Sequence, residues 1–397
     1  MVPARYAGFE AKREQYGHAL DSYVQSSLRA DPLADAVIEA LEPFEPRRRE
    51  QLLSAALSGR TDEVVPPALV ELLHHASRVP PWVDFEQMEK GGAVVLRGGL
   101  FSAAALLCYS LPLGYLSPGG TKPLVMTGAL VDNVVPRLRE TARFLVETCR
   151  PGGLRVGATG FQHTLRVRLM HARVRRRLAK SGRWDAAEWG APINQADMLG
   201  TNLMFSLAMI DALRNMGFRP AEREVAAMMM LWRYSGQLVG VEPELLPETE
   251  HGARRTMEMI LAIEKTPDSD GRTLTRAMLE ALRRGDSPFM GRVLEGVTRG
   301  LLGTEYANAL GVPKTPFALW VPMMRPVIGV LERARQWLPM GEVVARGAGT
   351  RAWEAVINSK PEQIPQEFSF VRQAAHVART LVPSRLESTF RKLKIVA

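Results

Sequence analysis

Apolar residues recur at helical spacing along most of the chain. They return every three or four positions, whereas runs that alternate apolar and polar residues between turn residues are nearly absent. This pattern is typical of amphipathic helices that bury one face in a core. The sequence therefore predicts an all-α protein.

Glycine and proline residues divide the pattern into segments. In the first 80 residues we predict helices over 31–41, 46–57 and 67–79, followed by an extended joint at Pro80 and Pro81, since proline cannot continue a helix. More apolar helices are predicted over 101–111, 136–149, 160–181, 195–216 and 220–239. More polar ones follow over 251–264, 274–284 and 290–302; the proline-rich 311–326 is expected to be a joint, and the end from Pro361 a basic helix.

Three local signals mark helix starts. Pro136 and Pro220 suit a first helical turn, where the missing N–H costs nothing. Asn194, with Asp197 three positions later, resembles an N-cap. No repeat or clean linker divides the chain, so we expect one helical domain over 1–397, with an N-terminal layer (1–85), a core (86–300) and a C-terminal layer (301–397).

Composition narrows the class of protein. With 46% hydrophobic and 23% charged residues among 397, the chain can bury a large core and is neither disordered nor fibrous. Its formal charge of +9 favours anionic partners, such as phosphates, carboxylated cofactors, nucleic acid or an acidic membrane surface. Cys108 and Cys149, the two cysteines, lie in apolar segments and indicate neither a disulfide framework nor a thiolate metal site.

The N-terminus and the longest apolar stretch bear on the cellular compartment. The N-terminus lacks the apolar run of a secretory signal, and the apolar stretch 101–115 is short and is interrupted by Pro112 and Gly114. A soluble, cytoplasmic protein in a reducing compartment is therefore expected.

The candidate chemistry lies in the basic segment 165–178, LRVRLMHARVRRRL. Arg168, His171 and Arg175 are three and four residues apart, which places them on one stripe of a helix with neighbours roughly 5–6 Å apart. This arrangement suits an iron porphyrin, because an imidazole can ligate the iron while guanidinium groups reach carboxylates at the ring edge. Two other interpretations stay open: a histidine satisfied in the core or at the surface, and a solvated or nucleic-acid-facing basic helix with seven Lys and Arg residues between Arg166 and Lys180.

Several segments, taken in order, resemble a known superfamily. PPWVDFEQMEKGG, SLPLGY, LVMTGAL, RLRET, RLMHARVR, PINQADMLGTNLMFS and WRYSGQLVGVEPELLP, between about Pro80 and Pro247, look like the latex-clearing proteins and related heme oxygenases, among them the oxygenase of mycophenolic acid biosynthesis. The resemblance implies a globin-like helical core around heme b and chemistry with O2.

The resemblance also assigns residues. In that superfamily the RxxHxxxR motif supplies the proximal ligand, which falls here on His171, with Arg168 and Arg175 at the flanking positions. We assign these two arginines to the heme propionates or to orientation of the cofactor. The RLxxT motif approaches the distal face and falls on Arg137 and Thr141.

Glu140 departs from the pattern, because rubber-cleaving members have lysine between the arginine and threonine of the distal motif. A carboxylate accepts hydrogen bonds when ionised, or acts as an acid when burial raises its pKa. This difference argues against cleavage of polyisoprene itself. Arg137, Glu140 and Thr141 share a helix face with Phe144 and can present a donor, a carboxylate and a hydroxyl to bound O2. Alternatively, Glu140 forms an ordinary surface pair with an arginine of its own helix, Arg137 or Arg143.

Two apolar segments that contain methionine and aromatic residues complete the candidate site. The segment 198–209 contains Thr201, Asn202, Met204 and Phe205, and the segment 228–232 contains three methionines and Trp232. Such residues suit a pocket for an elongated apolar ligand, with Thr201 and Asn202 as cofactor contacts; they equally suit a plain core.

These observations lead to three hypotheses. The first is a heme b oxygenase that uses O2 on an apolar, unsaturated or isoprenoid-like substrate, by oxygen insertion or oxidative C=C cleavage, with no nucleic-acid partner and with peripheral membrane contact as an option. The second is a non-catalytic heme sensor or carrier. The third is a basic helical protein that binds nucleic acid or a membrane surface. The oligomeric state is left open.

Overall fold

The computed structural model describes residues 2–59, 64–127, 134–283 and 288–358. All regular secondary structure within these ranges is helical, which confirms the all-α prediction. The basic helix predicted after Pro361 lies outside the described residues.

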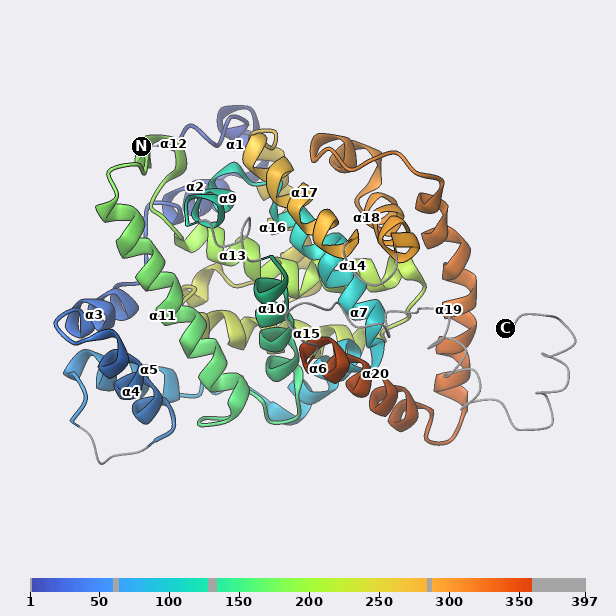
Figure 1. The fold of residues 1–397 in the computed structure, drawn as a ribbon, viewed down its shortest axis with the longest axis horizontal. Helices are drawn as coiled ribbons and strands as arrows, with labels where there is room; N and C mark the ends of the chain where they lie inside the picture. Colours follow the sequence, from blue (N-terminus) through green and yellow to red (C-terminus); the bar gives the residue numbers. More distant parts are fainter. Residues whose placement is uncertain (1, 60–63, 128–133, 284–287, 359–397) are drawn as a thin grey trace, which may run out of the picture.

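The N-terminal layer consists of α1 (Phe9–Tyr16), α2 (His18–Ser26), α3 (Pro32–Leu41), α4 (Pro46–Leu57) and α5 (Pro67–Ser77). Helices α3–α5 enclose a small hydrophobic core of their own, and its far wall is formed by Leu169 and Ala172 of α11 (Thr159–Lys180). The long helix α11 therefore has one face toward this layer and another toward the main core. In Figure 1, α11 runs between the blue α3–α5 group and the centre of the molecule.

The centre is built around α6 (Phe85–Gly98), which packs against α15 (Glu222–Val239), α10 (Val134–Cys149) and α20 (Gly341–Asn358). Two glycines of α6 make this close packing possible. A Cβ at Gly91 would lie 2.5 Å from the backbone of Ala227, and one at Gly92 would lie 2.2 Å from the carbonyl oxygen of Cys149. Larger side chains would push α6 away from α15 and α10.

The remaining helices surround this centre. Between α6 and α10 lie α7 (Leu100–Ala105), the π-helical turn η1 (Leu106–Ser110), α8 (Leu111–Gly114) and α9 (Pro118–Met126). After α11 come α12 (Ala186–Trp189), α13 (Gln195–Phe205), α14 (Leu207–Met216), α15, η2 (Pro243–Leu245), α16 (Glu250–Ile263), α17 (Ser269–Arg283), α18 (Pro288–Ala309), η3 (Pro316–Leu319), α19 (Trp320–Trp337) and α20. Figure 1 shows α18 and α19 on the side of the molecule opposite α3–α5.

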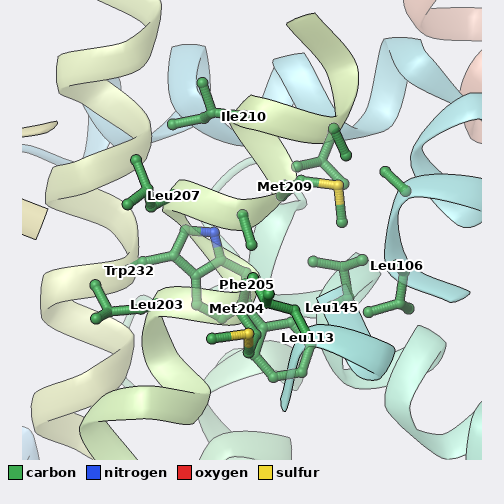
Figure 2. Close-up of a cluster of buried hydrophobic side chains, with 14 of the residues drawn as sticks. Leu106, Leu113, Leu145, Leu203, Met204, Phe205, Leu207, Met209, Ile210 and Trp232 are labelled. Atoms are coloured by element: carbon green, nitrogen blue, oxygen red, sulfur yellow. The ribbon is translucent and has the colours of Figure 1, made fainter. Parts of the chain in front are cut away.

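The main core is continuous across these helices. Figure 2 shows its centre, where Trp232 of α15 meets Phe205 and Leu203 of α13, with Leu145 and Leu106 contributed by α10 and η1. The rings of Phe205 and Trp232 are stacked, with centroids 5.0 Å apart and planes inclined by 15°.

Two start signals are confirmed and one is wrong. Asn194 caps α13 by accepting a hydrogen bond from the backbone N–H of Asp197 at 2.9 Å, and Pro136 lies in the first turn of α10. Pro220, by contrast, precedes α15, whose N-cap is Ala221.

Three segments differ from the predicted helices. The predicted 195–216 helix is broken at Ser206, whose backbone leaves the helical region while its hydroxyl donates to the carbonyl of Asn202 at 2.9 Å. The predicted 101–111 helix contains the π turn η1. The joint expected over 311–326 ends early, because α19 begins at Trp320 and accommodates Pro322 in its first turn and Pro326 in its interior.

Within the described residues, no single helix has the length and apolar composition needed to cross a membrane; α6 and the segment Leu100–Gly114 pass that test only as a pair, and they are bent by 89°.

Candidate cofactor and substrate cavity

A cavity of about 360 Å³ lies between α8–α11, α13, α15 and α16. Its size falls within the range of roughly 300–1,000 Å³ typical of ligand and cofactor sites. Three of its wall residues form an aromatic cluster, in which Phe144 of α10 makes edge contacts with both Phe205 and Trp232, at centroid distances of 5.5 and 6.0 Å. The π turn η1 contributes Leu106 and Ser110. An apolar ligand is therefore suited to this space.

His171 lines the cavity from α11. Val167, Met170 and Val174 line it with His171, at the spacing of one helix face. The Nδ1 atom of His171 is buried without a hydrogen-bond partner among the described residues. Burial, aided by the positive charges of Arg175 and Arg137, lowers the pKa of His171 to about 4. The imidazole is therefore neutral at physiological pH and keeps a lone pair for a ligand.

Arg168 and Arg175 do not line the cavity; both face α3. Arg168 donates from Nε and Nη2 to the two carboxylate oxygens of Asp31, at 2.7 and 2.8 Å, and both side chains are 4% exposed. Arg175 donates from Nε to Asp35 at 2.9 Å and from Nη1 to the carbonyl of Ile193 at 2.8 Å. The expectation that these arginines bind heme propionates does not fit this geometry, because their guanidinium groups are bound to carboxylates of the N-terminal layer.

The other charges of α11 are also largely neutralised. Arg166 pairs with Glu50 at 2.6 Å, Arg176 pairs with Glu42, and Lys180 pairs with Glu42 at 2.5 Å. With the pairs of Arg168 and Arg175, five of the seven basic residues between Arg166 and Lys180 have carboxylate partners. This face of α11 is therefore an interface with the N-terminal layer and not an open polyanion-binding surface.

Helix α10 brings Arg137, Glu140 and Thr141 to the cavity together with Phe144, as the sequence predicted from their shared face. The Thr141 hydroxyl donates to the carbonyl of Arg137 at 3.0 Å. Glu140 lies 3.6 Å from Arg137 Nη1, and its side chain is 69% exposed. The surface-pair interpretation of Glu140 is the one that this geometry matches, since its carboxylate is exposed beside the arginine one turn earlier on its own helix.

Thr201 and Asn202 of α13 also line the cavity. Their side chains serve the helices as well, because Thr201 donates to the carbonyl of Asp197 at 2.9 Å and Asn202 Nδ2 donates to the carbonyl of Trp232 at 2.8 Å. The second bond ties α13 to α15. Of the soft residues, Met198, Met204, Phe205 and Trp232 face the cavity, whereas Met228 and Met229 are fully buried in the core.

The cavity wall also contains a buried charged cluster that the sequence did not reveal. Arg5, from the segment before α1, lies between Glu264 at the end of α16 and Asp197 in the first turn of α13, with Nη2 at 2.5 and 2.7 Å from their oxygens. Ser117, the N-cap of α9, accepts from Arg5 at 2.8 Å. The backbone gives room for this guanidinium because Gly119 has no Cβ, which would lie 2.0 Å from Arg5 Nη1. We name Arg5, Ser117, Asp197 and Glu264 the Arg5 cluster.

The structure offers no thiolate site. Cys108 and Cys149 are buried and free, and burial raises the pKa of the Cys108 thiol to about 12. Within the described residues, no group of three or more His, Cys, Asp or Glu side chains is arranged to hold a metal ion.

Comparisons with known proteins agree on one family. Residues 99–339 match the family model described as ER-bound oxygenase mpaB/B'/Rubber oxygenase, catalytic domain. The chain is 24% identical over 298 residues to a rubber oxygenase from Streptomyces sp. (strain K30), covering 72% of this chain and 70% of that protein. Its fold is similar to that of latex clearing protein LCP in the closed state, with a TM-score of 0.61, 20% identity, and coverage of 90% of this chain and 91% of the other.

Proposed function

The chain belongs to the mpaB/B' and rubber oxygenase catalytic-domain family, and we propose that it is a heme b-dependent oxygenase that uses O2 on an apolar, unsaturated substrate. The observation that carries this proposal is the position of His171, a neutral imidazole in the wall of a largely apolar cavity. Within the family, the relative from Streptomyces sp. (strain K30) is a rubber oxygenase.

The residues present fit a heme. His171 is the proposed iron ligand, and its buried, unpartnered Nδ1 is the polar atom that a bound cofactor and its ordered surroundings would have to satisfy. Aromatic rings such as those of Phe205 and Trp232 suit the faces of a macrocycle. A heme held by His171 would supply the chemistry of O2 activation.

The protein's own contribution is to position His171 and the substrate and to shield the cavity from water. The Arg168–Asp31 and Arg175–Asp35 pairs hold α11 against α3, and the helix so held presents His171 to the cavity. The apolar wall excludes water and holds an apolar chain by burial of its surface. The family pattern assigns Thr141 and Arg137 to the distal side. Both line the cavity, where the hydroxyl and the guanidinium can orient a polar group of a bound molecule.

Glu140 does not have the role of a buried proton carrier in this proposal. Its exposed carboxylate, 3.6 Å from Arg137, instead sets the position of that guanidinium. Because the lysine of rubber-cleaving members is replaced here, we propose small isoprenoid or lipid-like alkenes as substrates in place of polyisoprene.

Two alternatives make different predictions. A heme sensor or carrier would bind the same cofactor at His171 without consuming O2. A basic nucleic-acid-binding protein would need free cations, and the pairing of α11 with Glu42, Glu50 and their neighbours weighs against it.

The test is oxygen uptake by the heme-loaded protein with a panel of unsaturated isoprenoids, with 18O2 and mass spectrometry of the products. Oxygen-dependent products that contain 18O support the oxygenase. Full heme occupancy with no uptake on any alkene would favour the sensor or carrier.

A further inference from the structure

The Arg5 cluster contains more negative charge than a structural ion pair requires. One guanidinium is held between two carboxylates, and the side chains of Arg5 and Glu264 are 1% and 6% exposed. Burying an extra charge is costly unless a partner compensates for it. Asp197 is fully engaged, since its other oxygen accepts from Asn194 at 2.8 Å. The negative charge that Arg5 does not compensate therefore resides on Glu264.

One carboxylate oxygen of Glu264 is hydrogen-bonded and the other is not. Oε1 accepts from Arg5 and lies 3.3 Å from the Ser117 hydroxyl, whereas Oε2 is buried without a hydrogen-bond partner among the described residues. Burial raises the pKa of Glu264, and the charge and hydrogen bonds of Arg5 only partly oppose this effect. Glu264 is one of the residues that line the cavity. Its buried Oε2 lacks a partner and can accept a hydrogen bond, or donate one when protonated.

From these contacts, and on the premise of the proposed function, we propose that Glu264 binds a hydroxyl group carried by an otherwise apolar substrate, so that the substrate class is an unsaturated isoprenoid alcohol. A hydroxyl both donates and accepts, and therefore satisfies Glu264 in either protonation state. An anionic group is disfavoured, because Arg5 is already bound to Glu264, Asp197, Ser117 and the carbonyl of Trp189. A pure hydrocarbon leaves Oε2 unpaired.

The test compares ligands that differ only in this group. Geraniol, its hydrocarbon counterpart 2,6-dimethyl-2,6-octadiene, geranic acid and geranylamine are titrated into the protein as isolated, with binding followed by isothermal titration calorimetry. We expect geraniol to bind about 10-fold or more tightly than the hydrocarbon, the difference that follows from leaving a buried acceptor unpaired. Equal affinities for the two, or tighter binding of the acid or the amine than of geraniol, would overturn the proposal.

Substitutions at Glu264 test whether this residue causes the preference for geraniol. Glu264→Met removes the carboxyl group yet leaves Arg5 neutralised by Asp197, and it should abolish the preference for geraniol; Glu264→Gln keeps a polar group and should retain it. The matched control is Glu224→Met, which removes the carboxylate from another buried arginine, Arg97, outside the cavity wall. It should lower stability and leave the preference intact. A Glu264→Met protein that still prefers geraniol contradicts the proposal, and the wild-type comparison remains decisive if that variant does not fold.

Heme content, read from the absorbance of the same samples, separates this inference from the proposed function. A preference for geraniol in a protein without heme supports the hydroxyl site while contradicting the heme enzyme. Heme-loaded protein without the preference overturns the hydroxyl site alone.

Discussion

Asp31 and Arg168 form a buried, two-pronged ion pair across 137 residues of sequence, and it lies one helical turn from His171. Asp31 is also the N-cap of α3, where it accepts a hydrogen bond from the N–H of Ala34 at 3.3 Å. Asp31 precedes the region 99–339 that matches the family model. The N-terminal layer thus fixes the helix that carries the candidate iron ligand.

Asp31→Asn is predicted to destabilise the protein strongly. Asparagine caps a helix as well as aspartate does, so the change removes mainly the charge that compensates Arg168. Breaking a buried pair in this way costs about 3–5 kcal/mol, to be measured as the free energy of unfolding in urea. As a control, Glu242→Gln removes the partner of the more exposed Arg29 and should cost less than about 1 kcal/mol. Equal effects of the two substitutions would contradict the importance of the Asp31–Arg168 pair.

Glu264 should make stability depend on pH. Burial raises the pKa of Glu264 above its ordinary value of 4.5, so above pH 4.5 the folded state holds a proton that the unfolded state has lost. The contribution of this residue to stability is therefore present at low pH and is lost as the pH rises through its folded-state pKa. Glu264→Gln, which cannot titrate, should gain stability relative to wild type between pH 4.5 and 8 in urea unfolding. A difference that is constant over that range, or that changes in the opposite direction, would show that the carboxyl is not perturbed in this sense.

Gly91→Ala should disrupt the packing of α6 on α15. The added methyl group would lie 2.5 Å from the backbone of Ala227, so the helices must separate, at a cost of about 1–3 kcal/mol or more. Gly347→Ala in α20 is the matched control, because no atom lies within 4 Å of its Cβ, and it should be neutral or stabilising by up to about 1 kcal/mol. Thermal unfolding of both variants checks this prediction. A stable Gly91→Ala protein would mean that the two helices are less closely packed than described.

Glu42→Gln should release two cations on α11. Glu42 pairs with both Arg176 and Lys180. Without its charge, Arg176 keeps only the longer contact with Glu39, at 3.9 Å, and both cations become more available to a polyanion. The salt concentration needed to elute the protein from heparin should rise more than for Glu45→Gln, which changes the net charge equally on a neighbouring exposed glutamate. Identical elution of the two variants would indicate that the α11 pairs do not restrain these cations in solution.

Local signals predicted much of the fold. Helical periodicity gave the all-α class, and the Asn194 cap and the shared face of Arg137, Thr141 and Phe144 follow from spacing within one helix. Apolar spacing continues through Ser206 and so does not reveal the break there. The prolines suggest a joint up to Pro326, but Pro322 fits the first turn of α19 and Pro326 is accommodated in its interior.

The partners of the site could not be predicted in the same way. Arg168 and Arg175 share a stripe with His171 in the sequence, yet a small rotation around the helix turns them toward Asp31 and Asp35, more than 130 positions away. Likewise, nothing near Arg5 signals that it meets Glu264, 259 residues later. Such pairs are products of tertiary packing, and no local pattern encodes them.

The central claim is that His171 binds a heme iron in this cavity, and the most direct measurement is the absorbance spectrum of freshly purified protein, oxidised and dithionite-reduced, beside His171→Ala. Protein that lacks cofactor after purification is first reconstituted with hemin. We predict a Soret band in the wild type that is lost or displaced in His171→Ala, while the far-ultraviolet circular dichroism of the two proteins remains the same. A wild type that stays colourless after reconstitution, or a His171→Ala variant with an unchanged Soret band, would contradict heme ligation by His171.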